Sequence, residues 1–200
     1  MSLTFRVPAQ TGTIAGLDRA DINQTTIAAF NIPLTSFRIH DAFNTNLPGT
    51  SSGNDLGLVG GTFGSAPPVL QTADLKAAGA TSNYARALFQ LPAEYDAGET
   101  IIIRVHAQMV TTVADTTSTV DVECYKVDQA AGIGSDLCAT AAQSINSLTD
   151  ADYDFTITPT GLAAGDVFDL RITSAVNDAA TGTAVIAEVG NVDLRCDIRA

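Results

Sequence analysis

The sequence predicts an all-β protein: a single antiparallel jelly-roll-like β-sandwich with an extended N-terminal arm. Apolar and polar residues alternate with a period of two in several segments, as expected for strands with one buried face. Turns rich in Gly, Asn and Asp separate these segments, and almost no stretch has a helical period. Roughly eight strands joined in this way favour a jelly roll or a related β-sandwich.

The clearest alternation lies between Gly98 and Asp128. The apolar positions are Ile101, Ile103, Val105, Ala107 and Met109 in its first half and Val120, Val122 and Cys124 in its second. Arg104, His106 and Glu123 are among the polar residues between them. A polar run, TTVADTTS, separates the two halves. The pattern therefore predicts a long antiparallel hairpin at the centre of the fold.

The N-terminal half contains weaker signals. We expect an extended arm over residues 1–10, within a single domain whose β-sandwich spans residues 11–200. Further along, the predicted elements are a loop with one strand over residues 11–30, a strand over 32–43, a long glycine-rich surface loop over 49–68, a short helical turn within 72–80 and a strand over 83–91. In the strand over 32–43, Phe37 and Ile39 should face inward and Arg38 and His40 outward.

The C-terminal half alternates more clearly. The predicted elements are a loop over 129–136, strands over 137–145, 155–159 and 167–176, and one long strand or two over 184–198 with a bulge near Gly190. Three of the predicted strands each place a run of alternate residues on one face: Ala85, Ala87, Phe89 and Leu91; Phe168, Leu170, Ile172, Ser174 and Val176; and Val192, Leu194, Cys196 and Ile198, which should face inward. The stretches Ala97–Arg104 and Ala164–Arg171 share the form A-G-[ED]-x4-R, and a hairpin is expected after each. This repeated motif suits a sandwich whose two sheets are similarly built, although shared turn chemistry alone could also produce it.

Composition limits the possible partners. The 200 residues include 10 basic and 22 acidic residues, for a net charge of -12, which repels phosphate backbones and anionic lipids. We therefore expect no nucleic-acid or membrane partner. We find no basic segment followed by an apolar one at the N-terminus and no run of 18 apolar residues, so we expect neither an export signal nor a membrane span.

The three cysteines lack C-x-x-C spacing, which fits a reduced cytoplasmic origin. Cys124 and Cys196 fall on the apolar parity of their strands and should be small buried side chains. A disulfide between them remains possible, because both could lie in one core.

Residues with catalytic or ligating chemistry are few, and we predict no catalytic, cofactor-binding or metal-binding residues. His40 and His106 lack a second ligand at metal-binding spacing. The run Asp150-Ala-Asp152-Tyr-Asp154 resembles a calcium loop but has Phe155 and Gly161 where an EF-hand needs Gly and Glu, so a solvated turn is expected. Asp121 and Glu123 share one strand face about 6 to 7 Å apart, which keeps a glycosidase as a third hypothesis.

Two turn motifs carry a family resemblance. The run Leu91-Pro-Ala-Glu-Tyr-Asp-Ala-Gly98 and the run Leu162-Ala-Ala-Gly165-Asp-Val-Phe-Asp-Leu-Arg171-Ile, with Asn177-Asp178 downstream, resemble turn and strand signatures of bacteriophage jelly-roll virion proteins. The resemblance covers about Leu91 to Ile198 and names no catalytic residue. Many relatives carry tryptophan after these turns, whereas this chain has none.

The resemblance implies a non-enzymatic virion structural protein, a capsid decoration or fibre subunit made in the host cytoplasm. Its partners would be the major capsid protein or another virion protein and further copies of itself, most often as a homotrimer. The candidate particle-contact residues are Leu3, Phe5 and Val7 of the arm and Gly60, Gly61 and Phe63 of the glycine-rich loop. The alternative is a receptor- or glycan-binding module of a phage tail or fibre, with exposed tyrosines as stacking faces.

Overall fold

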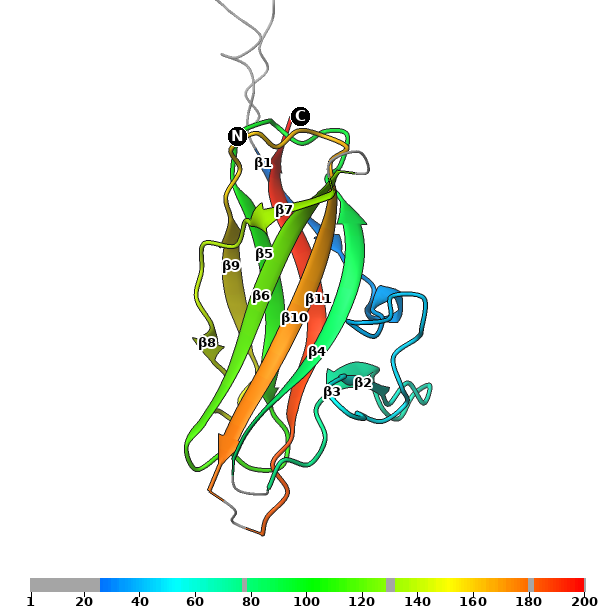
Figure 1. Ribbon diagram of the computed structural model, residues 1–200, viewed down its shortest axis with the longest axis vertical. Helices are drawn as coiled ribbons and strands as arrows, with labels where there is room; N and C mark the ends of the chain where they lie inside the picture. Colours follow the sequence, from blue (N-terminus) through cyan, green and yellow to red (C-terminus); the bar gives the residue numbers. More distant parts are fainter. Residues whose placement is uncertain (1–25, 77–78, 129–131, 180–181, 200) are drawn as a thin grey trace, which may run out of the picture.

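The structure, a computed structural model, describes residues 26–76, 79–128, 132–179 and 182–199. It is an antiparallel β-sandwich of two face-to-face sheets, which confirms the predicted fold class (Figure 1). Apart from the strands, a single short 3-10 helix is found in this part of the chain, at Leu34–Ser36. Among the described residues, no helix is long and apolar enough to cross a membrane.

Sheet A has six strands, in the order β2-β3-β11-β5-β9, and β1 also pairs with β11. Its strands are β1 (Thr26–Asn31), β2 (Gly57–Val59), β3 (Val69–Gln71), β5 (Ile101–Met109), β9 (Ala151–Ile157) and β11 (Ala187–Ile198). Sheet B has five strands, in the order β4-β10-β6-β7, and β8 also pairs with β6. Its strands are β4 (Gly79–Gln90), β6 (Thr117–Asp128), β7 (Gly132–Asp136), β8 (Gln143–Ser144) and β10 (Val167–Asp178).

The chain passes from one sheet to the other after nearly every long strand. Strands β4, β6 and β10 belong to sheet B, whereas β5, β9 and β11 belong to sheet A. The predicted hairpin is therefore wrong: β5 pairs with β9 and β11, and β6 pairs with β7, β8 and β10. Alternation identifies the buried face of a strand but does not identify its hydrogen-bonded neighbour. The hairpin expected after β10 fails for the same reason.

The core lies between the sheets, where the inward faces of the strands meet. All five predicted apolar positions of β5 are buried, and the polar positions between them are only partly covered. Ile103 is paired with Phe155 of β9 on one side and Leu194 of β11 on the other, and all three side chains are buried. The inward residues Val120, Val122 and Cys124 of β6 are buried as predicted.

Several other predictions are confirmed. Strand β4 has the predicted alternation through Gln90, and β10 buries Phe168, Leu170, Ile172, Ser174 and Val176. The register between β11 and β5 shifts between Val189 and Asn191, so the predicted bulge lies at Gly190.

Some element predictions are wrong. Residues 32–43 contain the 3-10 helix and an isolated bridge from Arg38 to Arg86 instead of a strand, although Phe37 is buried as predicted. Residues 72–76 form no helical turn, and 77–78 lie outside the described residues. Residues 132–136 form β7 rather than a loop, and the predicted strand over 137–145 shrinks to β8. These segments are short, and their pairing depends on neighbouring strand edges rather than on their own period.

The two turn motifs meet at one end of the sandwich. Tyr95 is buried, and its hydroxyl donates to the carbonyl oxygen of Glu99 over 2.8 Å, which closes the turn around Gly98. The backbone N–H of Gly165 donates to the carbonyl oxygen of Leu91 over 3.1 Å. Gly98 and Gly165 have φ angles of 90° and 86°, a conformation that favours glycine and that explains the shared motif.

The three cysteines are free. Cys124 of sheet B and Cys196 of sheet A are both buried, and burial raises the pKa of both thiols, that of Cys196 to about 11. They are therefore small apolar core residues, as predicted, and they do not form the disulfide that was the alternative.

Replacement of a core residue tests this architecture. The variant Ile103→Ala should lower the free energy of unfolding by about 2 to 5 kcal/mol, because it opens a cavity where β5, β9 and β11 pack. Urea denaturation followed by fluorescence or circular dichroism measures this loss. Leu148→Ala removes a similar side chain that is exposed and should change stability by less than about 0.5 kcal/mol. Equal effects of the two variants would contradict the core assignment.

Candidate functional site

The outer face of sheet B brings charged side chains from three strands together. In the register of the sheet, Arg171 of β10 lies opposite Arg86 of β4 on one side and Glu123 of β6 on the other. Asp169 lies two positions before Arg171 on the same face and opposite Tyr125 of β6. Two arginines directly opposite each other repel, so this arrangement needs nearby carboxylates.

Each arginine has its own carboxylate partner. Arg86 donates from Nε to Asp169 Oδ1 over 2.6 Å and from Nη2 to Asp169 Oδ2, which is the two-pronged geometry of a strong charge-assisted pair. The hydrogen bond to Asp169 raises the pKa of Arg86. Arg171 pairs through Nη2 with Glu123 Oε2. Because Asp169 is almost fully buried, this lattice of charges is held in place by the sheet.

Two tyrosines belong to the same face, but only one lines the cavity at the site. The guanidinium carbon of Arg171 lies 5.0 Å from the ring centroid of Tyr84, and the His40 ring lies 4.5 Å from the same ring. Tyr84 is therefore packed between neighbours and does not line this cavity. Tyr125 donates its hydroxyl to Glu123 Oε1 over 3.3 Å, and burial raises its pKa. Its ring is half-buried and lines the cavity.

The segment over residues 37–56 covers the free edge of β4. Arg38 and Arg86 exchange backbone hydrogen bonds of 2.8 and 3.1 Å, which fix this segment against the sheet. His40 therefore sits beside the charged cluster, with Nδ1 3.0 Å from Asp55 Oδ1 and Nε2 3.1 Å from Asp41 Oδ2. His40 lies on the outer side of the sheet as predicted, but only 12% of its side chain is exposed, because neighbouring groups surround it.

The cavity at this cluster has a volume of about 270 Å³, just below the range of about 300 to 1,000 Å³ that is typical of ligand pockets. Its lining residues are His40, Asp41, Arg86, Tyr125, Ile133, Asp169 and Arg171. We call this set and Glu123 the sheet B site. It offers an aromatic face, an apolar side chain and several fixed hydrogen-bonding groups within one small space. This combination suits a ligand with both apolar faces and hydroxyl groups.

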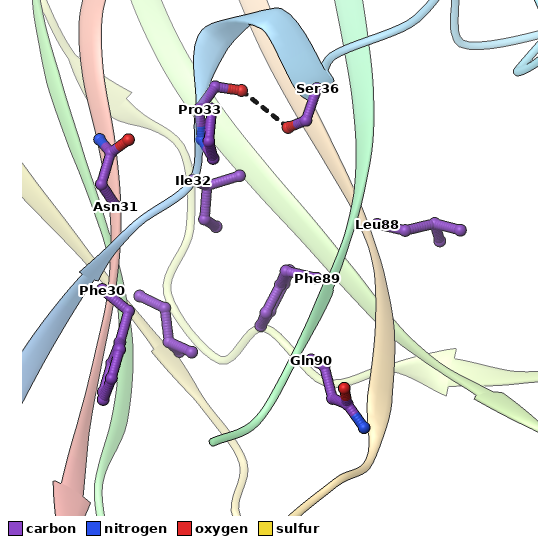
Figure 2. Close-up of a pocket in the computed structure, with 9 residues that line it drawn as sticks. Phe30, Asn31, Ile32, Pro33, Ser36, Leu88, Phe89 and Gln90 are labelled. Carbon is purple, nitrogen blue, oxygen red and sulfur yellow. Dashed lines mark hydrogen bonds between the residues drawn. The ribbon is translucent and has the colours of Figure 1, made fainter. Parts of the chain in front are cut away.

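A second cavity, of about 280 Å³, lies where β1 and β4 border the open side of the sandwich (Figure 2). Phe30 and Ile32 on the β1 side face Phe89 of β4 across it, and Leu88 points away from the others (Figure 2). The polar side chains that line it are Asn31, Ser36 and Gln90, and each hydrogen-bonds to another group of the protein. This groove is therefore mainly apolar and lacks the charged groups of the sheet B site.

Three of the six predicted contact residues can be placed in the structure, and they do not line the sheet B site. Leu3, Phe5 and Val7 lie outside the described residues. Gly60, Gly61 and Phe63 belong to the loop between β2 and β3, a hairpin at the side of the sandwich (Figure 1). Phe63 is fully exposed, and Gly60 has a φ angle of 82° with room for no side chain, because a Cβ there would lie 2.2 Å from the carbonyl oxygen of Pro67. Their role as contacts stays a prediction.

The outer face of sheet A carries a separate ionic cluster. His106 of β5 lies 2.9 Å from Asp152 and 2.7 Å from Asp150, and Arg104 donates to Asp154 over 2.6 and 2.7 Å. The three aspartates expected in a solvated turn therefore pair with β5 across the start of β9. Among the described residues, no three His, Cys, Asp or Glu side chains are grouped to hold a metal ion.

Most residues of the sheet B site could not be identified from the sequence. Asp121 and Glu123 were considered as paired carboxylates, but Glu123 is committed to Arg171 and Tyr125, and Asp121 accepts a hydrogen bond from the backbone N–H of Val122. Arg86 and Arg171 sit on the polar parity of their strands, which identifies them as outward-facing. Only the register of β4 against β10 shows that they are neighbours.

Comparison with known proteins gives fold similarity alone. No family model and no curated protein matches the chain. Among solved structures, a xylan-binding module named CBM15 has 11% identity over 88% of this chain and 100% of its own, with a TM-score of 0.47. The CBM22-1 xylan-binding domain of Paenibacillus barcinonensis Xyn10C has 10% identity over 88% and 97%, with a TM-score of 0.44.

A third similar structure is a carbohydrate-binding module named CBM28, described as specific for non-crystalline cellulose. It has 12% identity over 86% of this chain and 97% of its own, with a TM-score of 0.43. These structural neighbours are carbohydrate-binding modules, and none of the three is named as a virion protein. At such low identity, the similarity does not transfer a ligand to this chain.

The ionic cluster of sheet A should make stability depend on pH. The hydrogen bonds that the His106 ring donates to Asp152 and Asp150 raise the pKa of His106 above its usual value of about 6.5. The stabilisation from the charged ring is therefore fully present below about pH 6.5 and is lost as the pH rises through the folded-state pKa. The difference in free energy of unfolding between wild type and His106→Gln, measured by urea denaturation, should shrink as the pH rises.

The control for this experiment is Gln108→Ala, which removes the next outward side chain of β5 and its 2.7 Å hydrogen bond to Glu188. Its effect should not follow the pH dependence of the His106→Gln effect, because the variant leaves His106 and its aspartate partners in place. A His106→Gln effect that does not vary with pH would show that the charged form contributes nothing.

Proposed function

We propose that the protein is a non-catalytic carbohydrate-binding module and that the sheet B site is its binding site. The observation that carries this proposal is the position of the Tyr125 ring beside the paired groups Arg86–Asp169 and Arg171–Glu123. A sugar ring has an apolar face that can stack on an aromatic ring and a rim of hydroxyl groups that both donate and accept hydrogen bonds. The site provides partners for both.

The charged pairs serve binding because they fix the hydrogen-bonding groups before a ligand arrives. Asp169 is held by two bonds from Arg86, whose Nη1 also donates to the carbonyl oxygen of His40 over 3.2 Å. A ligand then loses less free energy in ordering the site than it would on mobile side chains. Hydrolysis would require Glu123 to transfer protons, but Glu123 is paired with Arg171. Binding makes no such demand on Glu123.

Attachment to a larger particle is a second proposal, favoured by Phe63. This side chain is fully exposed in a loop whose turn is fixed by hydrogen bonds of 3.0 Å from Gly61 to Ala66 and from Ala66 to Thr62. An exposed aromatic side chain on an ordered hairpin suits insertion into a partner protein. The resemblance of the turn motifs to phage virion proteins makes a virion surface, bound by one or several copies of the chain, the partner to test.

Replacement of Tyr125 tests carbohydrate binding. For any polysaccharide that binds the wild-type protein, Tyr125→Ala should weaken binding at least tenfold, since loss of a buried aromatic contact costs about 1.5 to 3 kcal/mol. Tyr125→Phe should keep most of the affinity, because the ring remains. Affinity gel electrophoresis and isothermal titration calorimetry measure both. Phe63→Ala is the matched control for loss of an exposed aromatic residue and should bind as wild type. Unchanged binding by Tyr125→Ala would exclude this site.

Replacement of Phe63 tests particle attachment. Phe63→Ala should reduce the occupancy of the protein on purified particles of its source at least tenfold, with no change in the free energy of unfolding, because the side chain contacts no core residue. Sedimentation of particles with added protein measures occupancy. Tyr125→Ala is the control here and should attach normally. Wild-type occupancy of Phe63→Ala would exclude this loop as the contact.

A further inference from the structure

Both guanidinium groups of the sheet B site are already neutralised by the protein. Arg86 is bonded to both oxygens of Asp169, and Arg171 is paired with Glu123. Two other cations nearby are also engaged: Lys126 lies 2.7 Å from Asp166, and Arg38 donates to the carbonyl oxygens of Thr35 and Phe37. Arg86, Lys126 and Arg171 are therefore neutralised by carboxylates of the protein, and the contacts of Arg38 are to uncharged carbonyl oxygens.

Carboxylates outnumber the cations around the cavity. Asp41 and Asp55 flank His40, in addition to the two carboxylates that pair with arginine. Asp121 lies two residues before Glu123 on the same face of β6, where burial raises its pKa. The sheet B site therefore holds three carboxylates, those of Asp41, Glu123 and Asp169, against two arginines. Two further carboxylates lie beside it, in a chain whose net charge is -12.

This charge distribution determines which sugar substituents the site can accept. Carboxylate oxygens accept hydrogen bonds, and a sugar hydroxyl can donate to them. A ligand carboxylate or sulfate brings only acceptors and a second negative charge. Two like charges in close contact near a protein surface repel each other more strongly than a single neutral hydrogen bond attracts.

We infer that the sheet B site binds uncharged glycans and excludes glycans that carry carboxylate or sulfate groups. This inference rests on the proposed carbohydrate-binding function and names its ligand class. Hydroxyl groups of the ligand donate to carboxylate oxygens at the rim, and Asp41 is the most accessible of these, since 85% of its side chain is exposed. The apolar face of the sugar then lies against Tyr125 and Ile133.

The experiment compares polysaccharides that share a backbone and differ in charge. The pairs are hydroxyethyl cellulose with carboxymethyl cellulose, methyl-esterified with de-esterified homogalacturonan, and unsubstituted xylan with glucuronoxylan. Affinity gel electrophoresis of the full chain should show binding to an uncharged member at least tenfold tighter than to its charged partner. The difference should narrow as the ionic strength rises from about 0.01 to 1 M, because the screening length falls from about 30 to 3 Å.

A charge reversal separates the local effect from the net charge of the protein. Asp41→Lys should reduce the discrimination within a pair at least threefold, whereas Asp115→Lys makes the same change at an exposed position in the loop between β5 and β6 and should leave it unchanged. Equal or tighter binding of the charged member would overturn the inference and leave the proposed function intact. Equal effects of the two variants would also overturn it, because the net charge would then explain the selectivity. Binding to none of the six polysaccharides would overturn the proposed function itself.

Discussion

The two sheets are held together by apolar side chains that successive strands direct into a single space. Strand β5 shows this most simply, since every second residue from Ile101 to Met109 is buried between the sheets. Burial of this apolar surface is the main source of stability. Because the chain changes sheet after nearly every long strand, each sheet depends on the other for its register and its position.

Once the inner faces are committed to the core, the outer faces are free to differ. On sheet A, Arg104 and His106 pair with aspartates of and next to β9, which ties two neighbouring strands together. On sheet B, the corresponding Arg171 faces Arg86, and both need carboxylates of their own. The repeated motif that ends at Arg104 and Arg171 thus lies in similar central strands of the two sheets, but the two arginines have different surroundings. Both ionic clusters have a small cavity beside them, of about 270 Å³ on sheet B and about 220 Å³ at His106 and Asp150 of sheet A. The cavity of sheet B is lined by a half-buried tyrosine, whereas that of sheet A is lined by no tyrosine among the described residues.

The fold alone does not decide among the functions considered. A jelly-roll sandwich suits both a carbohydrate-binding module and a structural protein of a virus, so the choice depends on particular side chains. The sheet B site contains the groups that a sugar would need, and it holds them in fixed positions. The exposed Phe63 and the apolar groove between β1 and β4 have the character of protein contacts instead. The two proposals use different parts of the surface, so one protein can serve both.

The sequence by itself determined the fold class, the inward faces of β4, β5, β6, β10 and β11, and the bulge at Gly190. Each follows from a local period or from a glycine, and such a signal can be recognised within a few residues of sequence. The partner of each strand could not be determined in this way, and the predicted hairpin of β5 with β6 failed because the two strands lie in different sheets. The candidate site could not be predicted from the sequence for the same reason. Arg86 and Arg171 are 85 residues apart in the chain, and their outward orientation was predictable, but only the pairing of β4 with β10 makes them neighbours. Tertiary structure decided the site because ionic and aromatic contacts across a sheet depend on register, and register is set by the packing of the whole sandwich.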